Sequence, residues 1–131
     1  MVLNELSSEI INAAIAVHKE LGPGLLESVY HSCMILELLR RKLKVESEVP
    51  VPVFYRGVQV NDEGFRIDLL VEDAIVIELK SVEKIQAVHK KQLLTYLRLA
   101  KKPLGLLINF NETILVDGIT RIVNNIPEQN G

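Results

Sequence analysis

Several features are scarce in this chain of 131 residues, and each scarcity excludes a class of protein. The single cysteine, Cys33, excludes an internal disulfide framework and is typical of a reducing compartment. Apolar runs such as residues 104–108 are far too short to span a bilayer, and the polar N-terminus lacks the basic start and apolar centre of a signal peptide. We therefore expect a cytoplasmic protein with no membrane partner.

Positive charge is not in excess either. The 15 Lys and Arg residues are outnumbered by 17 Asp and Glu, and the net charge of −2 excludes a uniformly basic nucleic-acid binder. A local basic stretch does run from Lys80 to Lys102, where Glu83 is the one acidic residue. A solvated helix face is its ordinary explanation, so its importance depends on the residues beside it.

With 48% hydrophobic residues, the chain can bury the core of one domain over residues 1–131. Apolar residues at helical spacing predict helices over 4–20, 25–42 and 84–100. Alternating or continuous apolar residues predict strands over 45–55, 58–60, 65–71, 75–80, 104–109 and 113–116. Pro50 and Pro52 lack an N–H, which places the first strand at a sheet edge or in a bulge.

This order, ααβββαββ, predicts an α/β fold with a mixed β-sheet flanked by helices. The helix over 84–100 lies between the strand 75–80 and the apolar strand 104–109. A parallel pair of strands needs a crossover of that kind, so we expect these two strands to be parallel neighbours.

The hairpin of residues 65–71 and 75–80 carries the most informative pattern. A period of two puts its apolar residues on one face and Asp68, Glu78 and Lys80 on the other. The second strand is otherwise almost wholly apolar, and charge there is costly unless a metal or partner compensates it. The hairpin is therefore the candidate site.

The register of this hairpin decides whether its two acids meet. Asp68 lies opposite Glu78 only if Val71 faces Ile75 and the loop is the three residues 72–74. A slip of one residue would turn Asp68 to the apolar face. We therefore predict the three-residue loop, or a bulge with the same effect.

Three segments in order along the chain carry a family resemblance. Asp68 followed by Glu78-Leu79-Lys80 resembles the D…(D/E)-x-K signature of the PD-(D/E)XK nuclease superfamily, with Ile67 where the superfamily name has proline. Residues 24–30 resemble the motif that names the GxxExxY proteins, a family assigned to that superfamily. Gln92-x-x-x-Tyr96 resembles a helix that lines the active site in RecB-like and lambda-exonuclease-like members. Similar segments extend from residue 18 to residue 110.

The resemblance implies a restriction-endonuclease-like core and a metal-dependent nuclease that acts on nucleic acid, DNA more than RNA. It implies that the catalytic site is formed by Glu27, Asp68, Glu78, Lys80, Gln92 and Tyr96. The Asp68 and Glu78 carboxylates and the Leu79 carbonyl are suitable ligands for Mg²⁺ or Mn²⁺, with Glu27 as a further ligand or water contact.

Roles for the other predicted residues follow from their positions. Lys80, two residues beyond Glu78, would orient the attacking water or stabilise developing charge. Gln92 and Tyr96, one helical turn apart, would hold the substrate phosphate or orient Lys80. Without a cation the two carboxylates repel, so one of them is expected to have a raised pKa.

Several alternatives stay open on the sequence alone. Glu27 in the first turn of a helix also suits the helix dipole. His18 and His89 either line the pocket or are partly buried structural residues. The domain as a whole is also compatible with a non-catalytic binding or assembly module, such as a homodimer, or with a hydrolase of small phosphate esters. The intact Asp68, Glu78 and Lys80 favour the nuclease, whereas the low overall basicity does not.

Overall fold

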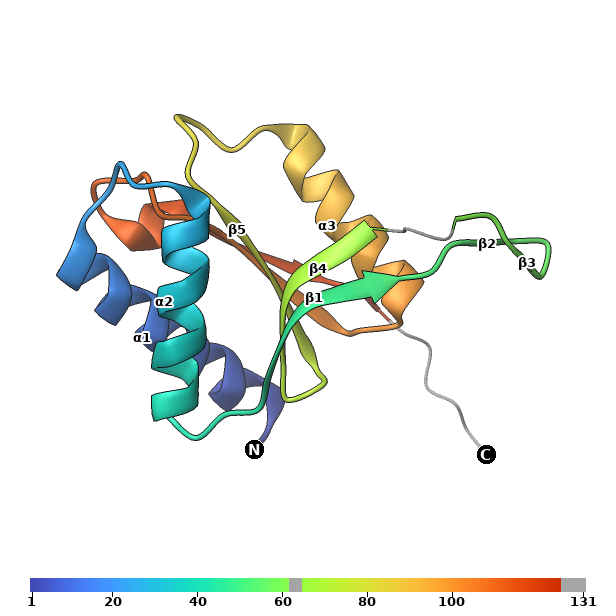
Figure 1. Cartoon of the computed structure of the whole chain (residues 1–131), viewed down its shortest axis with the longest axis horizontal. Helices are drawn as coiled ribbons and strands as arrows, with labels where there is room; N and C mark the ends of the chain where they lie inside the picture. The colour runs from blue at the N-terminus through green and yellow to red at the C-terminus, as the bar shows by residue number, and fades with distance from the viewer. Residues whose placement is uncertain (62–64, 126–131) are drawn as a thin grey trace.

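A computed structural model describes residues 1–61 and 65–125, so residues 62–64 and 126–131 of the predicted domain lie outside the described part (Figure 1). The helices are α1 (Leu3–Leu21), α2 (Glu27–Arg40), α3 (Ala87–Ala100) and the 3₁₀ helix η1 (Leu115–Gly118). The strands are β1 (Val45–Val51), β2 (Phe54–Tyr55), β3 (Val58–Gln59), β4 (Phe65–Val71), β5 (Ile75–Lys80), β6 (Leu104–Asn109) and β7 (Ile119–Val123).

Five strands form one mixed sheet in the order β1-β4-β5-β6-β7. The β5–β6 pair is parallel and the other three pairs are antiparallel. Helix α3 makes the connection between β5 and β6, which confirms the predicted crossover. Strands β2 and β3 pair only with each other and extend from the body as a separate arm (Figure 1).

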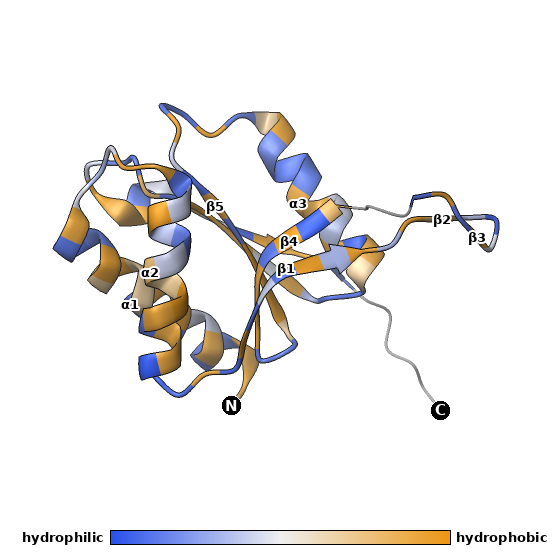
Figure 2. Ribbon diagram, viewed as in Figure 1, coloured by the Kyte–Doolittle hydropathy of each residue, from blue (hydrophilic) through white to orange (hydrophobic). Residues whose placement is uncertain are grey.

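Two apolar clusters hold helices against the two faces of this sheet. On one face, residues such as Ile10 of α1 and Met34 of α2 pack with Ile77 and Ile108. On the other face, Leu93 and Leu97 of α3 belong to a second cluster with strand residues. Because both faces are covered, the central strands are apolar almost throughout, as Figure 2 shows for β5. A charged residue on β5 therefore lies close to the core.

The predicted register of the central hairpin is confirmed. Strand β4 pairs with β5 from Leu69–Ile77 to Val71–Ile75, which leaves a three-residue loop at 72–74. Continuing this register by one pair would bring Asp68 opposite Glu78. The loop therefore places both acids where the two strands end their regular pairing.

Strand β1 is an edge strand, as the prolines predicted, but its irregularity lies elsewhere. Its pairing with β4 passes from Ser47–Leu69 to Val49–Ile67 and omits Glu48, whose φ of 54° is unusual for a side-chain-bearing residue. Asp68, opposite Glu48, has no ladder partner on that side.

This irregularity corrects one sequence prediction. Leu69 packs in the cluster beneath α1 and α2, whereas Ile67 packs in the α3 cluster. The two side chains were expected on one face because a regular strand alternates with a period of two. The distortion beside Asp68 breaks that alternation, so Ile67 and Leu69 lie on opposite faces.

The predicted strand over 113–116 is wrong. That segment passes through a turn into η1, and the last strand is β7, which the sequence analysis missed. Gly118, at the end of η1, explains the tight turn: a Cβ placed there would lie 2.6 Å from the carbonyl oxygen of Asn109. The turn depends on the close approach of two backbone segments. The apolar pattern of four residues, from which the strand was predicted, contains no information on such a contact.

No described helix combines the length and the apolar character needed to cross a membrane.

Candidate active site

Asp68 of β4 and Glu78 of β5 lie at the point where the two strands diverge. The Leu79 N–H donates a hydrogen bond to Asp68 Oδ2 over 2.9 Å. In a strand, the N–H and C=O of one residue project to the same side, so the Leu79 carbonyl also faces β4. The next carbonyl, that of Lys80, faces β6 and accepts from the Phe110 N–H over 2.9 Å. Two carboxylates and one carbonyl thus border the gap between β4 and β5.

Glu78 is an acid held in the core, with 7% of its surface exposed. Burial raises its pKa from 4.5 to about 10, and the hydrogen bond and negative charge of Asp68 contribute further, while the charge of Lys80 opposes the rise. Its Oε1 atom is buried and has no hydrogen-bond partner, alone among the described side chains in this respect. A buried carboxylate oxygen without a donor is an unsatisfied acceptor beside a second carboxylate.

These features fit a divalent cation. Within residues 1–61 and 65–125, no three His, Cys, Asp or Glu side chains are grouped so that they would hold a metal ion together. Mg²⁺ commonly takes one or two protein carboxylates and keeps several waters, so Asp68, Glu78 and a carbonyl such as that of Leu79 form a sufficient donor set. A cation there would favour the charged form of Glu78, against the burial and the negative charge of Asp68 that raise its pKa.

Lys80 follows Glu78 at the end of β5 and is half-buried. It forms no ion pair with any described residue, although its charge lowers the pKa of Glu78. Its ammonium group therefore acts on the same carboxylate without being fixed in a salt bridge. The structure brings Lys80 to the site that the sequence predicted for it.

The two predicted residues on α3 differ in their surroundings. Tyr96 is 8% exposed, and burial raises its pKa, with smaller contributions from the charges of Glu78 and Asp68. Its ring lies 5.4 Å from the ring of Phe65. Gln92 is exposed one turn earlier on the helix, and it makes no hydrogen bond to another described side chain.

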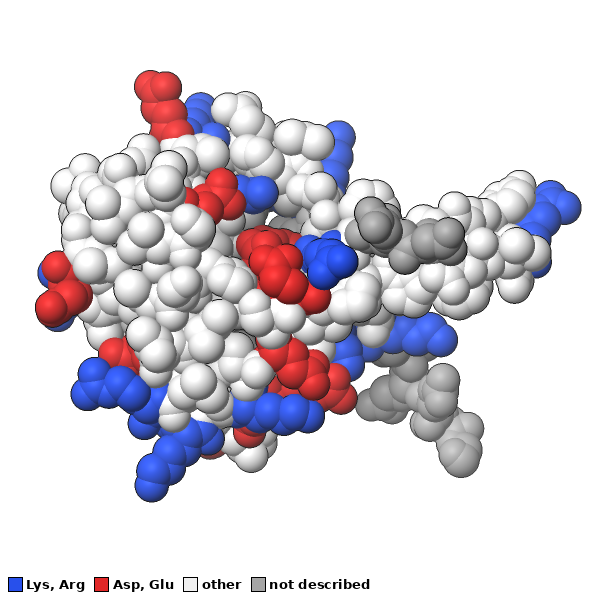
Figure 3. All heavy atoms as spheres, in the orientation of Figure 1, with Lys and Arg blue, Asp and Glu red and all other residues white. Residues whose placement is uncertain are grey.

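A cleft of about 250 Å³ opens beside Asp68. Its lining residues are Glu27, Ser28, His31, Glu48, Asp68 and Leu79. Helix α2 supplies the first three and the irregular segment of β1 supplies Glu48. The structure therefore brings Glu27 to the Asp68 side of the site, as predicted, with its exposed side chain at the start of α2. Figure 3 shows acidic and basic atoms side by side around a hollow on this face.

His31 is the residue that sequence reasoning missed. Its Nε2 lies 3.1 Å from the Asp68 carbonyl oxygen and 3.3 Å from Ser47 Oγ. The same nitrogen is 3.8 Å from Glu48 Oε1. The available signal was its spacing, because His31 is one helical turn after Glu27 and therefore shares its face.

The motif residue Tyr30 and the two remaining candidates, His18 and His89, have structural contacts. Tyr30 does not face the cleft: it is buried, its hydroxyl donates to the Gly22 carbonyl over 2.6 Å, and its ring stacks on Phe110. His18 Nε2 lies 2.8 Å from the Glu112 carbonyl oxygen. His89 Nδ1 accepts from the Gln86 N–H at the start of α3. Neither histidine lines the cleft beside Asp68.

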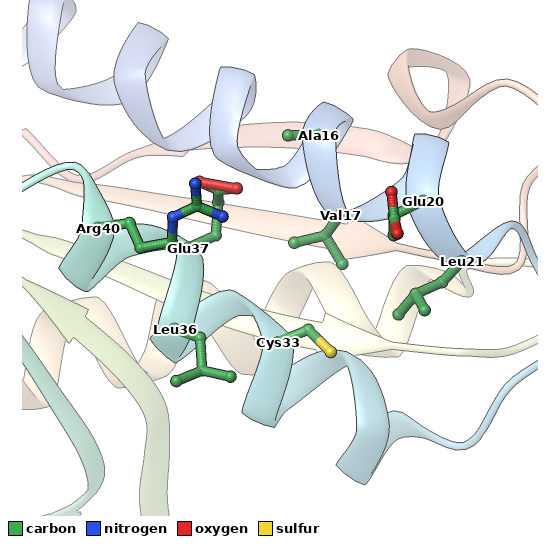
Figure 4. A pocket seen from close by; sticks show the side chains of 8 residues that line it. All are labelled: Ala16, Val17, Glu20, Leu21, Cys33, Leu36, Glu37 and Arg40. Atoms are coloured by element: carbon green, nitrogen blue, oxygen red, sulfur yellow. The ribbon is translucent and has the colours of Figure 1, made fainter.

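A separate groove of about 410 Å³ lies between α1 and α2 (Figure 4). Its lining residues are Ala16, Val17, Glu20, Leu21, Cys33, Leu36, Glu37 and Arg40. It contains none of the predicted site residues, and we assign it no part in the chemistry.

The α/β fold with a mixed five-stranded sheet, in which adjacent strands present Asp68 and Glu78-x-Lys80, is of the restriction-endonuclease-like class. The family model of the PD-(D/E)XK nuclease superfamily matches residues 4–122, and the chain belongs to this superfamily. Neither a curated protein nor a solved structure matches the chain. The match confirms the superfamily that the motifs indicated.

Proposed function

We propose that the protein is a metal-dependent nuclease that hydrolyses phosphodiester bonds of nucleic acid, with DNA favoured over RNA. The observation that carries this proposal is the pair of acids in the gap between β4 and β5. Glu78 Oε1 is buried without a hydrogen-bond partner among residues 1–61 and 65–125, and Asp68 lies beside it. A chain of the PD-(D/E)XK superfamily that retains such a pair has the donors that a nuclease metal requires.

Each residue of the site has a role that follows from its position. When bound, Mg²⁺ or Mn²⁺ supplies charge neutralisation at the phosphate and a lowered pKa of water. Asp68, Glu78 and the Leu79 carbonyl are the groups that would hold the ion. The Lys80 ammonium, which forms no ion pair with a residue that the structure describes, would orient the attacking water and stabilise negative charge on the phosphate.

Residues on the two flanking helices would position the substrate. The Tyr96 hydroxyl and the exposed Gln92 amide, on the same face of α3, would contact the phosphate. Glu27 and His31, across the cleft on α2, would bind waters on the other side of Asp68. The proposal thus gives α2 and α3 separate tasks on the two sides of the β4–β5 gap.

The likeness to GxxExxY proteins belongs to the same proposal. Gly24 has a φ of 92°, which favours glycine, and Tyr30 fastens the turn through hydrogen bonds to Gly22 and Leu25. The turn determines where α2 begins, and Glu27 is its first residue. The three named positions of the motif would therefore act together to present Glu27 beside Asp68.

Lys80→Ala tests the mechanism because it separates cleavage from binding. Loss of a group that stabilises the transition state is expected to lower the Mg²⁺-dependent cleavage rate on the order of a hundredfold or more. Loss of one phosphate contact changes affinity only modestly and in a salt-dependent way. Rates and affinities would be measured on single- and double-stranded DNA and RNA, with Mg²⁺, Mn²⁺ or EDTA.

Lys19→Ala is the matched control, because Lys19 is an exposed lysine at the end of α1. It should cut at the wild-type rate. Cleavage by Lys80→Ala at the wild-type rate would remove Lys80 from the mechanism. Wild-type protein that cuts none of these substrates with either metal would contradict the nuclease proposal and favour a binding module.

A further inference from the structure

The arm formed by β2 and β3 is a hairpin that takes no part in the main sheet. Phe54 pairs with Gln59 and Tyr55 pairs with Val58, so the loop is Arg56-Gly57. Both loop residues have positive φ, 49° and 81°, as a two-residue hairpin turn of type I′ requires. The Val60 N–H donates to the Val53 carbonyl over 3.0 Å and closes the base of the arm. The arm therefore has a defined shape.

The surface of the arm is unusual for an exposed element. Phe54, Tyr55, Val58 and Val60 are 58–64% exposed. Arg56 at the tip is the one charged residue between Val49 and Asn61, and its guanidinium lies 5.6 Å from the centre of the Tyr55 ring. Figure 3 shows basic atoms at the tip of this projection. Exposed apolar side chains that lie together on a protein surface usually mark a binding surface.

The base of the arm leads directly to the candidate active site. Val51, two residues before the arm, pairs with Phe65 of β4. Phe65 is 46% exposed and contacts the Tyr96 ring, and Asp68 lies three residues further along the same strand. Exposed Arg66 lies between them. One aromatic side chain, Phe65, and one cationic side chain, Arg66, thus lie on β4 between Asp68 and the end of the strand nearest the arm.

We propose that the arm, residues 53–61, is a nucleic-acid-binding element that holds the substrate strand as it leaves the active site. Phe54 and Tyr55 would stack on bases, and Arg56 and Arg66 would contact phosphates. The four residues from Val53 to Arg56 span roughly 13 Å at about 3.3 Å each, the rise of about four nucleotides of a duplex strand. This inference rests on the proposed function because it assigns the substrate to the same site.

Charge and size favour nucleic acid over a second copy of the chain. Within residues 53–61 the one charged side chain is Arg56, which can contact a phosphate, and Asp62 and Glu63 follow this segment in the sequence. Base stacking on aromatic rings tolerates any sequence and needs little surface, whereas a stable protein interface buries at least about 1,000 Å². A two-stranded ribbon also fits a DNA groove, where apolar side chains wedge between bases.

The test compares wild type with the double variant Phe54→Ser/Tyr55→Ser in an equilibrium binding assay in EDTA. Fluorescent DNA oligonucleotides of 4 and of 12 nucleotides, single-stranded and paired, serve as probes. Loss of the arm rings should weaken binding of the long oligonucleotide roughly tenfold or more, the loss expected for one or two stacked bases. Arg56→Ala should reduce the salt dependence of the binding constant by the amount expected for the loss of about one phosphate contact.

Two comparisons separate this effect from general damage. Leu36→Ser/Leu39→Ser also removes two exposed apolar side chains, 63% and 53% exposed, but from α2, and it should bind as wild type does. The oligonucleotide of 4 nucleotides is too short to contact the site and the arm at once, so the arm variant should lose less affinity for it than for the long oligonucleotide. An arm variant that binds the long oligonucleotide as tightly as wild type would overturn the proposal.

The same proteins distinguish the other outcomes. If the arm variant binds normally but changes the molecular mass measured by light scattering, the arm contacts a second copy and the proposal is wrong. If cleavage is absent in wild type while binding still depends on Phe54 and Tyr55, the arm proposal survives and the nuclease mechanism fails. If Lys80→Ala abolishes cleavage while the arm variants bind and cut as wild type, only the arm proposal fails.

Discussion

At the scale of single residues, Glu78 links the stability of the fold to the candidate chemistry. A carboxyl group that is 7% exposed beside Asp68 is unfavourable in its charged form. The sequence already showed the cost, because Glu78 interrupts an apolar strand. It did not show that Oε1 lacks a donor, since that depends on what surrounds the atom in three dimensions.

Glu78 predicts how the stability of the metal-free protein varies with pH. Burial raises its pKa from 4.5 to about 10, so between these values the folded protein holds a proton that the unfolded chain releases. The contribution of Glu78 to the free energy of unfolding in EDTA should therefore be most favourable below about pH 4.5. It should decrease as the pH rises toward 10. Urea unfolding at several pH values would measure the slope.

Glu78→Gln should remove this contribution, because the amide does not titrate. At pH 8 in EDTA we expect it to be more stable than wild type by about 1–3 kcal/mol, since its folding no longer requires an ionised carboxyl group to take up a proton. Glu83→Gln, an exposed acid three residues beyond β5, is the matched control. Equal pH slopes in wild type and Glu78→Gln would show that Glu78 does not carry the effect.

At the scale of elements, the central hairpin was the most predictable part of the chain. Its register follows from alternation and from loop length, and both agree with Val71 facing Ile75. The position of Asp68 relative to α2 was not predictable, because it depends on the irregularity at Glu48. Strand β7 was missed for a similar reason, since the turn at Gly118 is set by contact with Asn109.

The turn between α1 and α2 is held in place by one side chain, that of Tyr30. Tyr30 lies in α2, and its hydroxyl donates to the Gly22 carbonyl and accepts from the Leu25 N–H. Tyr30→Phe leaves the stacking on Phe110 in place but removes both hydrogen bonds. We expect it to lower the free energy of unfolding by about 1–2 kcal/mol, measured in urea.

Tyr55→Phe removes an equivalent hydroxyl from an exposed tyrosine, 64% exposed, and should change stability by less than about 0.5 kcal/mol. If Tyr30→Phe costs no more than this control, the turn does not depend on its hydroxyl. If Tyr30→Phe is fully folded under the assay conditions and still cleaves more slowly than wild type, the turn also contributes to the positioning of Glu27.

At the scale of the whole molecule, the fold holds two acidic side chains, Asp68 and Glu78, close together. Helices cover both faces of strands β4 and β5. The register in which these two strands pair brings Asp68 toward Glu78. Any ligand that binds this arrangement only in the folded state must stabilise the entire domain. Thermal stability is therefore a measure of metal binding that does not depend on finding the right substrate.

Mg²⁺ or Mn²⁺ should accordingly raise the melting temperature of wild type and leave Asp68→Asn unchanged. At ten times its Kd, a ligand adds RT ln 11, about 1.4 kcal/mol, which corresponds to roughly 3–6 °C for a domain of this size. The asparagine retains an oxygen that can accept from the Leu79 N–H, so the variant loses charge and little structure. Asp117→Asn, an exposed acid in η1, should respond to metal as wild type does. Equal shifts in wild type and Asp68→Asn would place the metal elsewhere, because an ion bound at the diverging ends of β4 and β5 must sense the loss of one of its two carboxylates.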